Sequence, residues 1–293
     1  MEAEVHRTMV VPSADVNFGD DGIGPEGGFG GPLGAAGFAA GTMSRASFAL
    51  LMFEFNVMIN RRSIQYEHYG DPRKVCHMVH YKIPTDVEGN DVLVEWLASP
   101  INPVDIYKIQ GHYVKLPLPA IAGSEAVGRV LKVGPSVSSL KEGDQVVLLG
   151  LTALHGQTCP TWTDCAVLDE KALLKIDSSI PLKEAATLTI NPSTAWAMLR
   201  TGNLRKGDWI VQNAANSGVG RAAIQIAKVK GYRTINIADL KSMGADEVWT
   251  EDEVNGKSEE WKGRPQLALN GVGGKSCGQI SEILATGGLL ITY

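Results

Sequence analysis

The segment Asp208–Ile237 constrains the fold more than any other stretch of the chain. It begins with the strand-like run DWIVQNAA, turns at two glycines, continues as the helix-like run GRAAIQIAKVKG and ends in the strand-like run RTINI. A strand, a helix and a strand in this order form a βαβ unit, whose two strands lie parallel in one sheet. The chain therefore contains a parallel sheet with helices packed on it.

The flanking segments extend this alternation. Pro181–Gly202 carries apolar residues at helical spacing, interrupted by the tetrapeptide NPST, and it precedes the βαβ unit. After the unit come QLALNGVGG, the helix-like SCGQISEILATGG and a last strand-like run, LLITY. Strands that alternate with helices predict a doubly wound parallel sheet.

The preceding part of the chain has a different pattern. Between Tyr81 and Asp177 it contains four short β-rich runs separated by Gly, Pro and Asp: DVLVEWLAS, AVGRVLKVG, DQVVLLG and CAVLDEKALLKI. Strands this closely spaced predict a compact β domain or barrel. The fold class is therefore α/β, with a β-barrel-type domain followed by a doubly wound sheet.

The N-terminal region differs from both. Phe18–Thr42 is glycine-rich and without periodicity, so we expect it to be disordered. From Met43 the run MSRASFALLMFEFNVMINRRS carries arginines, serines and one acid, which is typical of a mitochondrial presequence, and we expect Met43 to be an alternative start. A simple apolar tail is the other interpretation. We predict three parts, residues 1–60, 61–182 and 183–293.

Charge and composition exclude several classes of function. The net charge is −5 and no basic stripe with interleaved aromatic residues is present, so we predict no nucleic-acid partner. The longest apolar run, Ala46–Ile59, is shorter than the roughly 20 residues that cross a bilayer, so we predict no membrane span. The four cysteines form no CxxC pair, which argues against a zinc finger or a disulfide framework.

The glycine turn of the βαβ unit is the first candidate site. It follows a strand and opens a helix, where backbone N–H groups and the helix N-terminus can bind a pyrophosphate. The turn departs from the GxGxxG pattern, because Ala215 stands where the first glycine would be and Gly218 and Gly220 follow. The context predicts a dinucleotide site, and a plain strand-to-helix turn is the alternative.

Five motifs carry a family resemblance: INPVDIYKIQGHY, AGSEAVGRVLKVG, TLTINPSTAWAML, VQNAANSGVGRAAIQIAKVKGYRTIN and QLALNGVGGKS. Together they resemble the medium-chain dehydrogenase/reductase superfamily and, within it, the mitochondrial enoyl-[acyl-carrier-protein] reductases, over about Gln65–Tyr293. The resemblance implies a GroES-like catalytic domain followed by a Rossmann domain. It also implies NADPH-dependent reduction of trans-2-enoyl thioesters, carried by acyl carrier protein or CoA, in mitochondrial fatty acid synthesis by a homodimer.

The same resemblance assigns roles to individual residues. Tyr113 becomes the proton donor, and Asn191 contacts the cofactor while Pro192 fixes the turn beside it. The residues that line the pyrophosphate become Asn216, Ser217, Gly218, Val219 and Gly220.

The resemblance also bears on metal binding. Zinc-dependent members of the superfamily carry His in a GHE motif, and here the tripeptide is Gly123-Ser124-Glu125. Serine is a poor zinc ligand, so we predict no metal.

Two departures from the family pattern lead to further expectations. Only Ala238–Ala245 separates RTINI from the next strand-like run, DEVWT, and a parallel crossover usually takes about 10–12 residues, so we expect no room for one. No arginine cluster for a 2′-phosphate can be named there, and Asp239 is a candidate ribose partner. The chain stops at Tyr293, so we expect a truncated or splice form whose Rossmann sheet lacks its dimer edge.

Two other functions remain open at this point. A quinone oxidoreductase-like enzyme shares the zinc-free site and the NPVD region. A non-catalytic remnant is consistent with the shortened crossover and with the position at which the chain stops.

Overall fold

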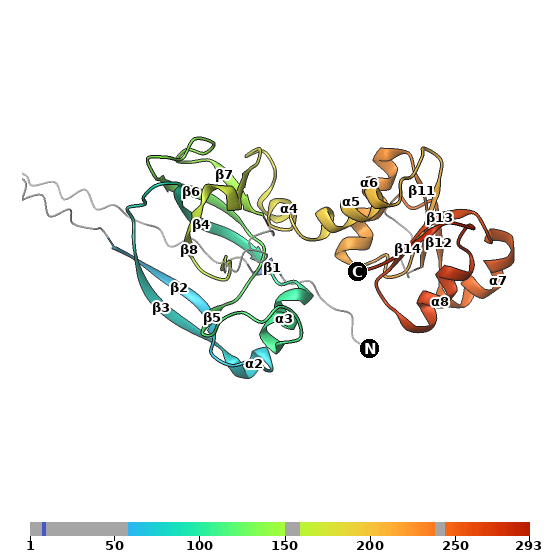
Figure 1. Cartoon of the computed structure of the whole chain (residues 1–293), viewed down its shortest axis with the longest axis horizontal. Helices are drawn as coiled ribbons and strands as arrows, with labels where there is room; N and C mark the ends of the chain where they lie inside the picture. The colour runs from blue at the N-terminus through green and yellow to red at the C-terminus, as the bar shows by residue number, and fades with distance from the viewer. Residues whose placement is uncertain (1–7, 10–57, 150–158, 238–243) are drawn as a thin grey trace, which may run out of the picture.

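The computed structural model describes residues 8–9, 58–149, 159–237 and 244–293. It has two lobes joined by the helices α4 (Leu182–Ala186) and α5 (Asn191–Thr201) (Figure 1). The glycine-rich segment and most of the presequence-like run lie outside the described residues. The end of that run does not, because Met58 begins the first long strand of the first lobe.

The first lobe is built on antiparallel strands. Its larger sheet has the order β1-β4-β6-β7-β9. The strand β8 lies outside this order and also pairs with β4. The strands are β1 (Thr8–Met9), β4 (Asp91–Pro100), β6 (Val127–Val133), β7 (Gln145–Leu148), β8 (Cys165–Asp169) and β9 (Leu173–Lys175). A 3₁₀ turn, Glu170–Ala172, divides the predicted run CAVLDEKALLKI into β8 and β9.

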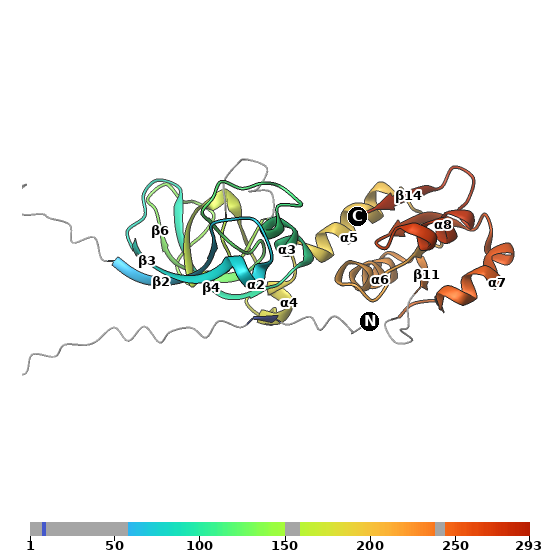
Figure 2. The same cartoon turned by 90° about the horizontal axis from the view of Figure 1, so that it is seen from below.

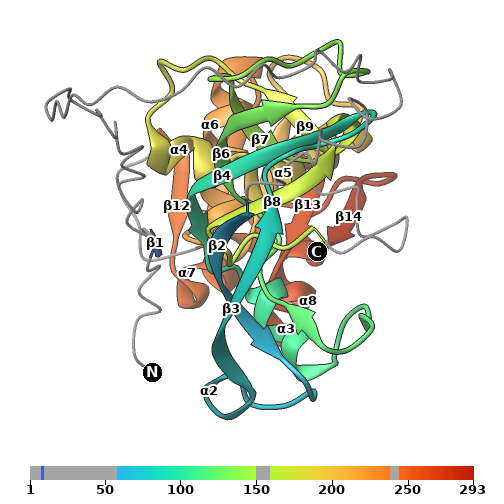
Figure 3. The ribbon, with the colours of Figure 1, turned by 90° about the vertical axis from the view of Figure 1, so that its left-hand side faces the viewer.

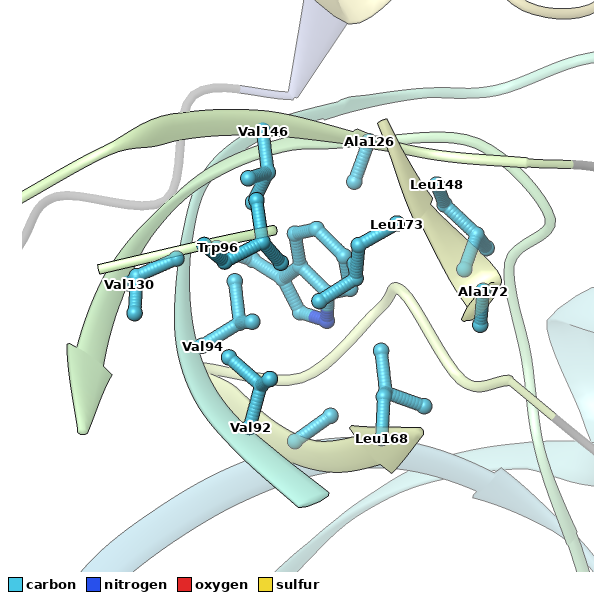
Figure 4. Packing of buried hydrophobic residues seen from close by; sticks show 12 residues of the cluster. Val92, Val94, Trp96, Ala126, Val130, Val146, Leu148, Leu168, Ala172 and Leu173 are labelled. Atoms are coloured by element: carbon cyan, nitrogen blue, oxygen red, sulfur yellow. The ribbon is translucent and has the colours of Figure 1, made fainter. Parts of the chain in front are cut away.

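Strand alternation explains the core of this sheet. Val92, Val94 and Trp96 lie two residues apart on β4, so their side chains point to the same side and enter one buried cluster. Figure 4 shows them in one cluster with Leu148 of β7 and with Leu168 of β8, the strand that pairs with β4. The indole N–H of Trp96 donates to the carbonyl oxygen of Pro160 (3.1 Å), which satisfies the one polar group placed in this cluster.

A second, smaller sheet extends this lobe. β2 (Met58–Tyr66) and β3 (Cys76–Pro84) form a long antiparallel hairpin, with α2 (Pro72–Val75) near its turn (Figure 3). The short strand β5 (Ala120–Ile121) pairs with the end of β2. No residue of β3 is buried, and the sequence analysis did not predict this hairpin.

The second lobe is a parallel sheet with helices on both faces (Figure 2). Its strand order is β12-β11-β10-β13-β14, and all four pairings are parallel. The strands are β10 (Trp209–Gln212), β11 (Arg233–Ile237), β12 (Glu247–Trp249), β13 (Pro265–Asn270) and β14 (Leu289–Thr292), and the helices are α6 (Gly218–Lys230), α7 (Glu251–Trp261) and α8 (Gly274–Glu282).

Neighbouring residues of one strand enter opposite cores. Ile210 packs with α5 and α6 on one face, whereas Val211 packs with α7 and α8 on the other. On β13, Leu267 packs in the core with α5 and α6, whereas Ala268 packs in the core with α7 and α8. All four residues are buried. A parallel strand covered on both faces reads as a continuous apolar run, as these strands do.

The expected lack of a crossover after Ile237 was wrong. β12 pairs parallel to β11, with Ile235 opposite Glu247 and Ile237 opposite Trp249. These strands are short, so the connection only has to travel back over a few residues at about 3.3 Å each. The carboxylate of Asp246 accepts from the Thr234 backbone N–H (2.8 Å) and pairs with the Arg233 guanidinium, which fixes the register at the end of the connection.

Two other details of the second half differ from the sequence analysis. Asn191 and Pro192 belong to the first turn of α5 rather than to a separate turn, which suits proline because a first-turn residue needs no N–H partner. Helix α7 was missed, although Thr250 and Glu253 form a capping box at its start. No helix among the described residues is long and apolar enough to cross a bilayer.

Candidate active site

The glycine turn lies at the carboxyl end of β10, where it starts helix α6. Ser217 is the N-cap of this helix, and its hydroxyl oxygen accepts a hydrogen bond from the Gly220 N–H (3.0 Å). The first N–H groups of a helix have no intrahelical acceptor, and together with the helix dipole they favour an anion. The turn thus presents backbone donors at the edge of the parallel sheet.

Gly220 and Gly218 are both required by close contacts, but of different kinds. A Cβ on Gly220 would lie 2.5 Å from the carbonyl oxygen of Ala214, so only glycine lets the helix start this near the strand. A Cβ on Gly218 would lie 2.8 Å from Cγ and Nδ2 of Asn191. Two segments predicted to bind one cofactor, the turn and Asn191, are therefore in direct contact.

The other predicted turn residues have different environments. Asn216 is exposed, whereas Val219 is buried and packs in the core between α5, α6 and the sheet. Val219 therefore contributes its backbone N–H, and not its side chain, to the edge of the sheet. Ala215, in the place of the first glycine, is buried, and the preceding Ala214 adopts a left-handed conformation (φ 51°).

A buried amide network beside the turn was missed in the sequence analysis. Asn213 donates from Nδ2 to Oδ1 of Asn270 (2.8 Å) and accepts with Oδ1 from the Gly271 N–H (2.7 Å). Asn270 Oδ1 also accepts from the Gly273 N–H (2.9 Å). The network ties the ends of β10 and β13 together. An asparagine at the end of each apolar strand run was the signal for it.

Tyr293 was also missed as a member of this region. Its hydroxyl lies 3.5 Å from the hydroxyl of Ser217, and its backbone N–H donates to the carbonyl oxygen of Asn270. A Cβ on Gly271 would lie 2.8 Å from the Tyr293 hydroxyl oxygen. Burial raises the pKa of Tyr293 above its usual value, while the hydrogen bond with Ser217 opposes that rise.

Glu125 occupies the seam between the two lobes. It is 1% exposed, and its Oε1 accepts from the backbone N–H groups of Thr189 and Ile190, both at 2.7 Å. The Thr189 hydroxyl donates to the same oxygen (3.2 Å). Burial raises the pKa of this carboxyl, and the hydrogen bonds that it accepts oppose the rise.

The second oxygen of Glu125 begins a chain of side chains that reaches the glycine turn. Asn102 donates from Nδ2 to Glu125 Oε2 (2.9 Å). Asn191 in turn donates from Nδ2 to Asn102 Oδ1 (3.3 Å). Because Asn191 also contacts Gly218, an unbroken path of contacts runs from the first lobe to the start of α6.

Helix α3 (Pro103–Gln110) directly precedes the loop that contains Tyr113. Asn102 is its N-cap, and its C-cap residue Gly111 is left-handed (φ 76°). Tyr113 follows in an irregular loop and is 57% exposed. The hydroxyl of Tyr69 donates to the carbonyl oxygen of Leu116 (2.6 Å), which anchors the far end of this loop. The structure thus presents the predicted proton donor to solvent.

Charged groups lie under this loop. The Lys108 ammonium donates to the Ser124 hydroxyl (2.7 Å), at the position where zinc-dependent relatives have a histidine. Burial lowers the pKa of Lys108 and raises that of Asp105, whose Oδ2 accepts from the Asn102 backbone N–H (2.8 Å). Within residues 58–149, 159–237 and 244–293, no group of three His, Cys, Asp or Glu residues could hold a metal ion. Asp239, the candidate ribose partner, lies outside the described residues.

The chain is similar to known proteins over most of its length. The alcohol dehydrogenase GroES-like domain family matches residues 88–177. The chain is 48% identical over 252 residues to the mitochondrial enoyl-[acyl-carrier-protein] reductase of Caenorhabditis elegans, covering 80% of this chain and 71% of the relative. It is 45% identical over 251 residues to the human protein of the same name, covering 79% of this chain and 65% of the relative.

Solved structures agree with these matches. The mitochondrial 2-enoyl thioester reductase Etr1p/Etr2p heterodimer of Candida tropicalis aligns with a TM-score of 0.71 at 30% identity, covering 80% of this chain and 75% of that chain. The Etr1p complex with NADP and crotonyl-CoA gives the same values. A structure described as a putative NADPH:quinone reductase from Bacillus thuringiensis aligns with a TM-score of 0.69 at 27% identity, covering 80% and 72%.

The predicted fold class, a GroES-like lobe followed by a Rossmann-type parallel sheet, is confirmed by these matches together with the observed strand order. Identity of 48% over most of the chain and over 71% of a relative also settles the family. The chain belongs to the mitochondrial enoyl-[acyl-carrier-protein] reductases of the medium-chain dehydrogenase/reductase superfamily.

Proposed function

We propose that this chain reduces the C2=C3 double bond of trans-2-enoyl thioesters with NADPH, in mitochondrial fatty acid synthesis. The observation that carries the proposal is the contact of Asn191 with Gly218 at the N-terminus of α6, because it joins the two predicted cofactor segments at one sheet edge. A structural neighbour at 30% identity is described as a complex with NADP and crotonyl-CoA, which supports the choice of both ligands.

The residues at the sheet edge fit a dinucleotide. The turn Asn216–Gly220 offers backbone donors and the positive end of the α6 dipole to the pyrophosphate. A Cβ on Gly218 would collide with the side chain of Asn191, so glycine at this position lets Asn191 lie against the start of α6. Bound NADPH supplies the hydride that C3 of the substrate accepts.

Tyr113 is proposed to complete the reduction by giving its phenolic proton to C2. One hydride and one proton together add two hydrogens across the double bond, so the electron count is balanced. The phenolic O–H group of Tyr113 is a hydrogen-bond and proton donor. Its exposure places the hydroxyl within reach of an acyl chain that arrives from solvent.

The thioester carrier and the assembly are part of the proposal. The acyl group can be carried by acyl carrier protein or by CoA, and we propose a homodimer. The homodimer rests on the family resemblance of the sequence motifs. Light scattering on the purified full chain measures its oligomeric state.

The direct test uses the full chain and two tyrosine variants. We expect saturable NADPH binding and NADPH oxidation with crotonyl-CoA. Tyr113→Phe should lower kcat by about 10²- to 10⁴-fold and leave the NADPH Kd unchanged, because it removes only the proton donor. Tyr107→Phe is the matched control, since Tyr107 is similarly exposed on the helix that precedes the loop, and it should keep full activity.

Two results would replace this function with another. Oxidation of NADPH by a quinone but not by crotonyl-CoA would assign a quinone reductase, the alternative favoured by the Bacillus thuringiensis neighbour. A chain that folds but does not bind NADPH would be a non-catalytic member of the family.

A further inference from the structure

The two oxygens of Glu125 have different tasks. Oε1 accepts three hydrogen bonds from the Thr189–Ile190 segment, so it holds that segment against the first lobe. Oε2 accepts from Asn102 Nδ2, which has no part in that segment. A carboxylate that only holds the Thr189–Ile190 segment needs the hydrogen bonds to Oε1 but not the hydrogen bond from Asn102 to Oε2.

Both oxygens of Glu125 accept hydrogen bonds in this structure, and this acceptor role fixes the direction of both amides beyond it. Asn102 must turn Nδ2 toward Glu125, so its Oδ1 faces Asn191. Asn191 must then turn Nδ2 toward Asn102, which leaves its Oδ1 as the outward atom. Among the described residues, this Oδ1 takes part in no hydrogen bond.

We propose that Glu125 is a positioning residue that sets the direction of the Asn102–Asn191 amide relay, so that Asn191 presents a hydrogen-bond acceptor to the bound cofactor. The inference rests on the proposed cofactor site. Its chemical consequence is specific: an acceptor at this point matches a hydroxyl of a ribose or the N–H of a carboxamide, and it repels the oxygens of a phosphate. Asn191 therefore contacts a sugar or the nicotinamide amide, while the turn at Ser217–Gly220 contacts the pyrophosphate.

Glu125→Gln separates the relay from the contacts of Oε1 with the Thr189–Ile190 segment. The glutamine Oε1 can still accept from the Thr189 and Ile190 N–H groups, while its Nε2 becomes a donor facing Asn102. Asn102 and Asn191 can both reverse and remain satisfied, so the variant should fold with little change in stability. The relay would then present Nδ2 of Asn191, a donor, where the wild type presents an acceptor. We expect the NADPH Kd to rise on the order of tenfold.

Asn191→Asp provides the complementary change. In this variant Asn102 lies between two carboxylates, those of Glu125 and of the introduced aspartate. Its amide has one NH₂ group and one oxygen, so the oxygen always faces one of the two carboxylates without a hydrogen bond. This variant should be destabilised and should bind NADPH weakly. In Glu125→Gln/Asn191→Asp the reversed Asn102 donates to one oxygen of the introduced carboxylate, and the second oxygen of that carboxylate again presents an acceptor. The double variant should therefore recover both stability and affinity relative to Asn191→Asp.

The experiment is a double-mutant cycle with two readouts on the full chain: the free energy of unfolding in urea without cofactor, and the NADPH Kd by fluorescence. Glu95→Gln combined with Asn191→Asp is the matched control, because Glu95 pairs with Arg129 on the outer side of β4 and should show no coupling. Rescue in both readouts supports the proposal. Additive effects in both would overturn it.

The two readouts also separate this inference from the proposed function. Suppose that the wild type binds NADPH and that the double variant recovers stability but not NADPH affinity. This result would overturn the inference that Asn191 presents an acceptor to the cofactor. A folded wild type that does not bind NADPH would overturn the proposed function, and coupling in the unfolding data would still support the relay from Glu125 to Asn191.

Discussion

The two lobes place their functional groups in opposite ways. In the parallel sheet, the groups at the site are backbone N–H groups, glycines and strand-end asparagines, all at the carboxyl ends of the strands. In the antiparallel lobe they are long side chains on a helix and on connections, with Lys108 and Tyr113 from α3 and its following loop and Glu125 just before β6. The proposed cofactor side should therefore be sensitive to added atoms, and the proposed catalytic side to removed groups.

The largest expected effect concerns the buried tryptophans that support each lobe. Trp249 is fully buried and meets Trp261 edge to face, with ring centroids 5.4 Å apart, while Trp96 fills the core of the antiparallel lobe. Trp249→Ala and Trp96→Ala should each lower the free energy of unfolding by about 3–5 kcal/mol, because each leaves a cavity. Urea unfolding followed by circular dichroism measures both. If one loss is under about 1 kcal/mol, that core is not continuous as described.

A smaller effect tests the sensitivity to added atoms. In Gly220→Ala the new methyl group meets backbone, so we expect a loss of about 1–3 kcal/mol in the free energy of unfolding. In Gly218→Ala the methyl group meets only the side-chain amide of Asn191, so stability should fall less while NADPH affinity falls as much or more. Thermal melts and NADPH titrations of the pair check this, and equal effects on both quantities would contradict it.

The smallest effect is a pH dependence that belongs to Glu125. Its raised pKa means that folding favours the protonated carboxyl, so the group stabilises the fold most below the ordinary glutamate pKa of about 4.3. That contribution is lost as the pH rises through the higher folded-state pKa. As the pH rises from below the ordinary glutamate pKa, wild type should therefore lose unfolding free energy relative to Glu125→Gln. A difference that stays constant as the pH rises would contradict the shift.

The parallel sheet was predictable because its segments carry their own signals. β10, α6 and β11 are continuous apolar or amphipathic runs with a glycine turn between them, and their order alone implies parallel pairing. The hairpin β2–β3 carries no such signal. No residue of β3 is buried, and β2 is buried only toward its end, at Ser63, Gln65 and Tyr66, so most of the hairpin lacks the apolar alternation that marks a half-buried strand. Its strands are held by pairing with each other and with β5.

In the candidate site too, the parts that could be predicted are those whose residues lie close together in the sequence. Ser217 and Gly220 could be named from local spacing, since a cap and its partner are close in sequence. The relay could not be read in this way, because Asn102, Glu125 and Asn191 come from three separate segments whose contacts depend on tertiary structure. The motif comparison placed Asn191 in the site, but only the packing shows its neighbours. Glu125 belongs to the tripeptide Gly123-Ser124-Glu125, whose sequence indicates only that a histidine zinc ligand is replaced by serine.

The crossing between the lobes has a mechanical consequence. Ala185 and Ala186 of α4 pack into the first lobe, and Ala195, Met198 and Leu199 of α5 pack into the second, so among the described residues the chain passes between the two bodies at Thr187–Ile190. Glu125 fastens Thr189 and Ile190 to the first of these. A rotation of the two described lobes about this segment would therefore pivot close to the start of α5. Points on a pivot move least, so Asn191 would keep its contact with Gly218 while parts of the molecule farther from this hinge swing through larger arcs.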